Sequence, residues 1–147
     1  MKHRGFSHIG LSTLDLDKTR AFYEGVLGFK PVVGDTITIE EGGHLRHMFF
    51  DVGGGQLIAF LEPNGVPDVP AKYDAGINRG LGVPAGFYHF AFEAGSMAAL
   101  AETRRTARQG RRDDRNRRPR MGSIDLLQRP QRHLARILLR GRQPPGG

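Results

Sequence analysis

The sequence predicts an α+β fold, and two observations lead to that prediction. Residues 6–62 alternate short apolar runs of strand length with one helix-spaced segment, in the order strand, helix, then three or four antiparallel strands. The pattern of residues 6–11 (Phe, any residue, His, apolar, small, apolar) returns at residues 87–92, and a helix is expected after each. The chain therefore contains an internal repeat with a period of 81 residues.

Local signals predict each element of the first repeat. Residues 6–11 form an apolar run between polar residues, which is typical of a strand. Asp15 suits a helix N-cap, apolar residues recur at helical spacing as far as Leu27, and Gly28 lies where a helix C-terminal glycine is common. Further strands, separated by glycine turns, are predicted at residues 29–33, 36–40, 45–52 and 56–62.

The second repeat starts in the same way. A strand is predicted at residues 87–93 and a helix at residues 97–105, whereas the residues that should form its remaining strands are missing. Gly and Pro are frequent before it, which predicts a connector. The expected division is a first module at 5–62, the connector at 63–86, the start of a second module at 87–103 and an Arg-rich tail at 104–147.

The charge of the chain changes sign at about Arg104. Residues 1–103 carry 8 basic and 12 acidic residues, a net charge of −4, whereas residues 104–147 carry 14 Arg and 3 Asp, a net charge of +11. The overall charge of +7 therefore originates in the tail. Such a tail could bind nucleic acid or an acidic surface, although we do not expect nucleic acid as the partner of this chain.

The tail can also be read as a second module in the wrong reading frame. A one-base shift of the codons for residues 121–137 permits the string Trp-x-Arg-Ser-Ile-Tyr-Phe-Asn-Asp-Pro-Asn-Gly-Ile-Ser-Leu-Glu. That string has an alternating strand, a turn and a second strand. We therefore hypothesise a frameshift near residues 104–107, genuine or introduced by sequencing. An authentic Arg-rich tail is the alternative.

Composition excludes several other classes of protein. The chain has no cysteine, so disulfide frameworks and thiolate metal sites are excluded. Its N-terminal residues lack the apolar run of a signal peptide, and no segment approaches the roughly 20 apolar residues of a membrane span. We expect a cytoplasmic protein with no membrane partner.

Taken together, these segments resemble the vicinal oxygen chelate superfamily, the group of glyoxalase I, bleomycin-resistance proteins and extradiol dioxygenases. The resemblance rests on FSHIGL with His8, the helix and turn LDKTRAFYEGVLGFK, the hairpin HMFFDVGGGQLIAFLEP and FYHFAFE with His89. It covers about residues 5–103. The order of the motifs and the repeated Phe-x-His make it specific.

The resemblance implies paired βαβββ modules, the second disrupted after about residue 104, whose curved sheets surround one divalent metal. It implies His8 and His89 as metal ligands and a homodimer for the intact fold. The third family ligand, a Glu near the end of the last strand, appears only in the shifted frame. Ala59 aligns with a further ligand position of glyoxalases and epimerases. Two His and one carboxylate favour Fe(II), with Mn, Zn or Ni also compatible.

The function implied by the resemblance is extradiol-type ring cleavage of a catechol-type, aromatic substrate, impaired here by loss of the third ligand. The metal would lower the pKa of the substrate hydroxyl and orient the substrate. Three alternatives stay open: a glyoxalase I-like lyase or thiol transferase, a metal-free small-molecule binding or resistance protein, and a nucleic-acid-binding protein.

Two further groups of residues are candidates for a site. His47 could act as an acid or base, although a solvated surface histidine is the simpler interpretation for both His47 and His44. In the connector, the pairs at residues 73–74 and 78–79 could cover a substrate, since long ordered loops often carry function. An ordinary polar linker is the alternative.

Overall fold

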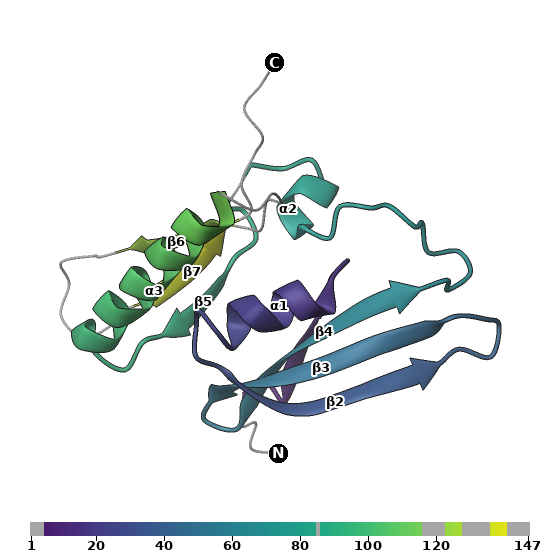
Figure 1. The fold of residues 1–147 in the computed structure, drawn as a ribbon, viewed down its shortest axis with the longest axis horizontal. Coiled ribbons are helices and arrows are strands. Elements are labelled where there is room, and N and C mark those ends of the chain that lie inside the picture. The colour runs from purple at the N-terminus through teal and green to yellow at the C-terminus, as the bar shows by residue number, and fades with distance from the viewer. Residues whose placement is uncertain (1–4, 85, 116–122, 128–135, 141–147) are drawn as a thin grey trace. The chain divides into compact units, whose positions relative to one another are not determined.

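The computed structural model describes residues 5–84, 86–115, 123–127 and 136–140 (Figure 1). The chain forms two compact units, Met1–Tyr73 and Asp74–Gly147. Each unit contains helix and sheet, which confirms the predicted α+β class.

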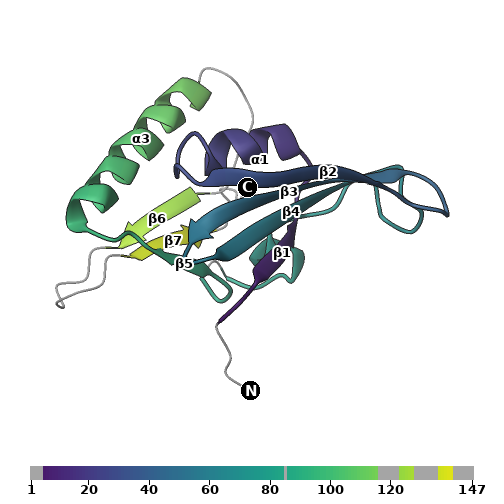
Figure 2. The ribbon, with the colours of Figure 1, turned by 90° about the horizontal axis from the view of Figure 1, so that it is seen from below.

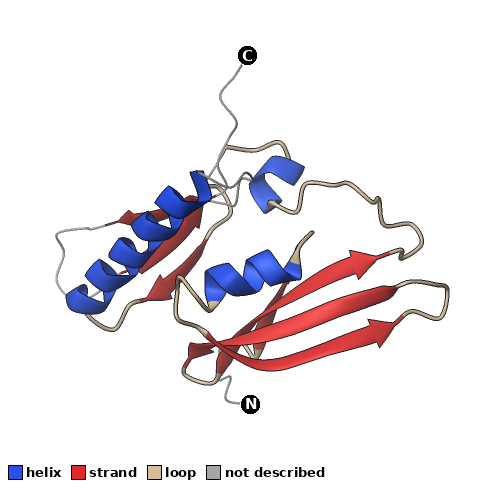
Figure 3. Ribbon diagram, viewed as in Figure 1, coloured by secondary structure: helices blue, strands red, loops and turns tan. Residues whose placement is uncertain are grey.

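The first unit is a four-stranded sheet with one helix on it (Figure 3). The strand order is β1-β4-β3-β2; β1 is parallel to β4 and the other neighbours are antiparallel. Strands β1 and β2 form the two edges, and α1 lies along one face (Figure 2). The predicted order of strand, helix and three strands is confirmed. The elements are β1 (His8–Ser12), α1 (Leu16–Tyr23), β2 (Lys30–Thr38), β3 (His44–Gly53) and β4 (Gln56–Asn64).

Three element boundaries in this unit differ from the prediction. Strand β1 begins two residues later, at His8, and α1 ends at Tyr23, after which the chain turns as far as Gly28. The φ angle of Gly28 is 74°, which glycine adopts without steric cost. The strands predicted at 29–33 and 36–40 are one strand, β2, with a register shift after Pro31. Because proline has no amide hydrogen, an irregularity there interrupts a ladder that is already incomplete.

The core of the first unit lies between α1 and the sheet. Phe50 on β3 and Ile58 on β4 are 0% and 1% exposed. The Tyr23 ring, at the end of α1, lies on Phe60 with the ring centroids 4.6 Å apart and on Phe50 at 5.7 Å. Burial raises the pKa of Tyr23, because the phenolate would lose its hydration there. Alternate residues of β3 and β4 thus hold the helix against one face of the sheet.

Polar contacts fix the start of α1 on the same face. The predicted N-cap is confirmed, since the Asp15 carboxylate accepts a hydrogen bond from an amide of the first turn at 2.9 Å. Glu62 on β4 accepts a hydrogen bond from the amide of Leu16 at 2.7 Å. Arg46 on β3 donates to Glu62 at 3.2 Å and to Asp17 at 2.8 Å. The hydrogen bond from Arg46 lowers the pKa of Asp17.

Among the described residues, the second unit has two helices and a three-stranded antiparallel sheet of order β5-β7-β6. Leu100 and Ala107 of α3 are buried; they lie seven residues apart and therefore share one helix face. None of the described helices has the length and apolar character that crossing a membrane requires. The elements are α2 (Ile77–Gly80), β5 (Phe90–Glu93), α3 (Met97–Arg115), β6 (Ser123–Leu127) and β7 (Arg136–Arg140).

Two expectations for the chain beyond residue 104 are wrong. The helix predicted to end at residue 105 runs to Arg115, because Arg and Gln favour helix and the next proline is Pro119. The strands expected to be missing are present as β6 and β7, whose sequences SIDLL and RILLR supply short apolar runs without aromatic residues. Disruption of the second module after residue 104 is therefore not confirmed, and the frameshift stays a prediction.

The core assignment predicts a difference between two isoleucines. Ile58→Val removes a methyl group from a fully buried site and should lower the free energy of unfolding by about 1 kcal/mol. The same change at Ile37 on β2, which is 41% exposed, should cost less than about 0.5 kcal/mol. Urea unfolding followed by circular dichroism measures both. Equal losses would show that Ile58 is not part of the core.

Candidate functional site

The face of the first sheet turned away from α1 carries the histidine predicted to bind metal. Since Phe50 and Ile58 face α1, the pleat turns their neighbours Phe49 and Ala59 to the opposite side. We call this side the distal face. Strand register places on it His8, Gly10 and Ser12 of β1, Leu57, Ala59 and Leu61 of β4, His47, Phe49 and Asp51 of β3, and Val33 and Asp35 of β2.

Two histidine rings meet one phenylalanine ring on the distal face. His8 meets Phe49 edge to face, with centroids 5.5 Å apart and an interplanar angle of 74°. His47 lies against the same ring at 4.3 Å. Gly10 on β1 and Ala59 on β4 occupy the row of Phe49, and their small size lets His8 of β1 reach the Phe49 ring across β4. The result is a cluster of three flat side chains from β1 and β3.

His47 lies within ion-pair distance of Asp35. The two residues are directly opposite each other on β3 and β2, and Nδ1 of His47 lies 3.3 Å from a carboxylate oxygen of Asp35. The His47 side chain is 14% exposed and that of Asp35 is 50% exposed. His47 is therefore largely covered, in contrast to the expected solvated surface histidine, while His44 on the same strand is exposed.

A pair of hydroxyl groups lies at the β1 edge of the distal face. Tyr73, in the segment after β4, is half-buried, and its hydroxyl is hydrogen bonded to Oγ of Ser12. Thr13, the next residue after Ser12, donates its amide to Leu61, so β1 remains paired to β4 at this point. The first of the connector residues suggested by the sequence is thus placed on this face.

His89 lies directly before β5 rather than inside a strand, since β5 begins at Phe90. Its ring is exposed, and Nδ1 lies 3.1 Å from the carbonyl oxygen of Gly86. The buried Asn78 of α2 holds this segment: its amide donates to the Tyr88 carbonyl at 2.7 Å and accepts from the Tyr88 amide at 2.9 Å. The backbone that carries His89 is therefore fixed by a side chain of the connector.

An ion pair supports the beginning of α2. Arg79 donates to both carboxylate oxygens of Asp74, at 2.6 and 2.8 Å, and Asp74 also accepts from the Gly76 amide at 2.9 Å. The hydrogen bond from Arg79 lowers the pKa of Asp74. These contacts give Asp74 and Arg79 a role in holding α2, whereas Asn78 holds the backbone of Tyr88. That these connector residues cover a substrate stays a prediction.

The predicted metal ligands His8 and His89 belong to different units. Nδ1 of His8 is hydrogen bonded to Ser7 Oγ at 3.1 Å, and Nδ1 of His89 to a carbonyl. When Nδ1 donates, Nε2 carries the lone pair that a metal ligand needs.

Ala59 has no ligand atom, as expected. Within the described parts of the chain, however, no three His, Cys, Asp or Glu side chains gather closely enough to hold a metal ion. The described residues therefore do not fit a three-ligand metal site, and the pairing of His8 with His89 stays a prediction.

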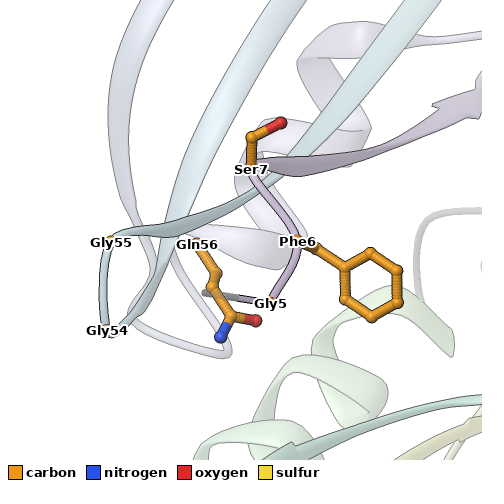
Figure 4. Close-up of a pocket in the computed structure, with 6 residues that line it drawn as sticks. All are labelled: Gly5, Phe6, Ser7, Gly54, Gly55 and Gln56. Carbon is orange, nitrogen blue, oxygen red and sulfur yellow. The ribbon is translucent and has the colours of Figure 1, made fainter. Parts of the chain in front are cut away.

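A hollow of about 350 Å³ lies where the chain enters β1, beside the β3–β4 turn (Figure 4). The side chains of Phe6, Ser7 and Gln56 line it together with the glycine backbone, and Gln56 lies beside Gly5, where an added Cβ would be 3.2 Å from the Gln56 amide nitrogen. The sequence predicted only a turn at residues 53–55. The lining residues are Gly5, Phe6, Ser7, Gly54, Gly55 and Gln56.

Comparison with known families identifies the fold. The model of the Glyoxalase/Bleomycin resistance protein/Dioxygenase superfamily matches residues 5–124. The chain belongs to this superfamily. Its first unit has the βαβββ order expected of a vicinal oxygen chelate module. No significant match was found among curated proteins or among solved structures.

The contacts of Asn78 predict how the His89 segment responds to its removal. Asn78→Ala would leave the amide and carbonyl of Tyr88 without their partner, at a cost of about 1–3 kcal/mol. Hydrogen exchange at the Tyr88 amide should therefore become at least about tenfold faster. Asn64→Ala in the first unit, where the Asn64 side chain makes longer contacts of 3.3 Å, is the control and should leave Tyr88 protected. An unchanged exchange rate at the Tyr88 amide in Asn78→Ala would show that Asn78 does not hold this segment.

Proposed function

We propose that this superfamily member binds a small, flat aromatic molecule on the distal face of its first unit. The observation that carries the proposal is the contact of the His8 and His47 rings with the Phe49 ring. Aromatic and imidazole rings attract flat ligands through edge-to-face and offset contacts beyond the burial of area alone. Sequestration of an aromatic ligand is also what the resemblance to bleomycin-resistance proteins implies.

The small and apolar residues of the distal face support this proposal. Gly10 and Ala59 have little or no side chain beside the Phe49 ring, and Leu61 adds apolar surface in the adjacent row. A few polar groups surround this apolar surface, and such a combination is the usual composition of a small-molecule site. These are His8, His47, Asp35, Ser12 and Tyr73.

Binding of benzamide, a neutral flat molecule, tests the proposal. Phe49→Leu keeps an apolar side chain but removes the ring, so the Kd for benzamide should rise about 3- to 10-fold. Phe22→Leu changes a ring of α1 that contacts Tyr23, and serves as the matched control with an unchanged Kd. Isothermal titration calorimetry measures the three proteins. Equal affinities for Phe49→Leu and the parent chain would refute the proposed face.

Ring cleavage of the extradiol type, dependent on a divalent metal, is a second candidate function. The observation in its favour is that Nδ1 of His8 and of His89 each has a hydrogen-bond partner, and that of His89 is a carbonyl oxygen, so Nδ1–H of His89 donates and its Nε2 is available for a metal. A bound Fe(II) would supply Lewis acidity and electron transfer to oxygen. Two imidazole ligands without a carboxylate ligand would hold such an ion weakly.

This second candidate predicts weak metal binding by the chain as written. After incubation with Fe(II) or Zn(II) and desalting, less than stoichiometric metal should remain, and ring cleavage should be negligible. A frame-restored protein, which regains the family Glu, should retain metal, and His8→Ala or His89→Ala in that protein should abolish retention. Elemental analysis gives the result. Stoichiometric metal in the present chain that survives both substitutions would place the site elsewhere.

A further inference from the structure

We propose that α3 of the second unit binds the phosphate backbone of double-stranded nucleic acid, without preference for base sequence. The observation that carries this inference is that the six arginines of α3 occupy one side of the helix. The sequence alone does not favour nucleic acid as the partner, because it assigns these arginines to a tail. The structure instead continues α3 as far as Arg115. This inference concerns α3 and does not depend on the distal face.

The spacing of the arginines places them on one side of α3. An α-helix turns by about 100° per residue, so residues about 4, 7 or 11 positions apart return to nearly the same side. Two neighbouring rows of arginine positions result, and together they cover about a third of the helix circumference. We call this side the basic face. Its positions are Arg104, Arg108, Arg111 and Arg115 in one row and Arg105 and Arg112 in the other.

The acidic residues of α3 lie outside the basic face. Helical spacing places Glu102 and Asp113 at least about 60° beyond one edge of it, and Asp114 about 60° beyond the other edge. The helix carries six arginines and three acidic residues, a net charge of +3. Because the two signs of charge are on different sides, the positive charge is concentrated where a polyanion can approach.

The basic face is open to solvent where its side chains are described. Arg105 and Arg108 are exposed, and Arg104 is half-buried. Arg105 forms an ion pair with Glu102, but the two side chains are 73% and 64% exposed. An ion pair so exposed contributes little free energy. A phosphate group can therefore replace Glu102 as the partner of Arg105 at little cost.

The helix is packed in its unit beside the basic face. Leu100 and Ala107 are 1% and 4% exposed, and helical spacing places them next to the row that begins at Arg104. The backbone of α3 contacts strand β6 (Figure 1). The arginine positions are therefore held in line before a partner arrives, and binding costs less conformational entropy than ordering a flexible arginine segment would.

The length of the basic face and its residue type fit a nucleic-acid backbone. At about 1.5 Å per residue, the distance along the axis from Arg104 to Arg115 is roughly 17 Å. This length corresponds to about five base pairs of DNA, at about 3.4 Å each. The planar guanidinium group donates two parallel hydrogen bonds to a phosphate, which the ammonium group of lysine cannot do. Contacts of this kind fix position on the duplex but carry no information on base sequence.

An anionic membrane is the other partner that a basic helix can take, and the described residues favour it less. A helix that binds a membrane surface inserts large apolar side chains beside its basic residues. Among the residues of α3 whose side chains are described, Met97 is the one large apolar residue that is exposed, and it lies seven residues before Arg104. The large apolar residue nearer to the arginines, Leu100, is already buried.

Binding of the full chain to a fluorescein-labelled DNA duplex of about 20 base pairs tests the proposal. Fluorescence anisotropy should give a Kd in the micromolar range at about 50 mM KCl, and a second duplex of unrelated sequence should bind within about twofold. The affinity should fall steeply with salt, because each neutralised phosphate releases counterions. Failure to bind either duplex, or a preference of more than about tenfold between them, would overturn the proposal.

A double variant assigns the binding to α3. Arg105→Gln together with Arg108→Gln should raise the Kd at least about tenfold and reduce the slope of log Kd against log salt by about two. Lys18→Gln together with Arg20→Gln is the matched control, because it removes the same charge from exposed, ion-paired positions of α1. The control should change the Kd less than about twofold. Circular dichroism confirms that both variants are folded.

The same variants separate α3 from the other sources of positive charge. An unchanged Kd in the α3 variant would show that arginines elsewhere in the chain bind the duplex. Equal losses in the α3 variant and the α1 variant would show a general effect of net charge. Sedimentation with vesicles that contain about 30% phosphatidylserine tests the membrane. Binding to these vesicles that is lost in the α3 variant, while binding to the duplex is not, would make a membrane the partner and overturn the proposal.

Discussion

The alternation of side chains along β3 and β4 is the constraint on which the rest of the first unit depends. Phe50 and Ile58 are buried under α1, and this requires their neighbours Phe49 and Ala59 to face the other side. A shift of either strand by one residue would exchange the two faces, burying His47 against the helix and exposing the core. Packing of the core and composition of the distal face are therefore consequences of the same register.

The ends of the β3–β4 hairpin hold that register. At one end, the turn through Gly54 and Gly55 uses φ angles of 63° and 73°. At the other end, Gly43 approaches Gly65 so closely that an added Cβ would lie 2.5 Å from its carbonyl carbon. Glycine is required there because any side chain would separate the strands. With both ends fixed, His44 pairs with Asn64, and each later pair follows.

Membership of the superfamily does not by itself select a reaction, because one fold hosts several chemistries and the side chains of the site decide among them. In the first unit, the distal face brings together two histidines, one aromatic ring and a carboxylate. In the second unit, Asn78 holds the backbone before β5, so the orientation of His89 depends on a connector residue.

Local patterns in the sequence were sufficient for the elements of the first unit and for the Asp15 cap, because these depend on residues within one turn or one strand of each other. The superfamily and the choice of His8 and His89 as candidates came instead from the order of the motifs and from the repeat of Phe-x-His after 81 residues. The same reasoning missed strands β6 and β7, because it took residues 104–147 for an Arg-rich tail without strand-forming residues.

Only the tertiary structure decided which polar residues share the distal face. Asp35 lies opposite His47 because β2 and β3 pair in one particular register, which no local sequence pattern predicts. Ser12 meets Tyr73 across 61 residues of chain, because β1 pairs with β4 and the following segment returns to the β1 edge. The sequence by itself determined which elements form; their pairing, governed by burial of the α1 face, determined which side chains can act together.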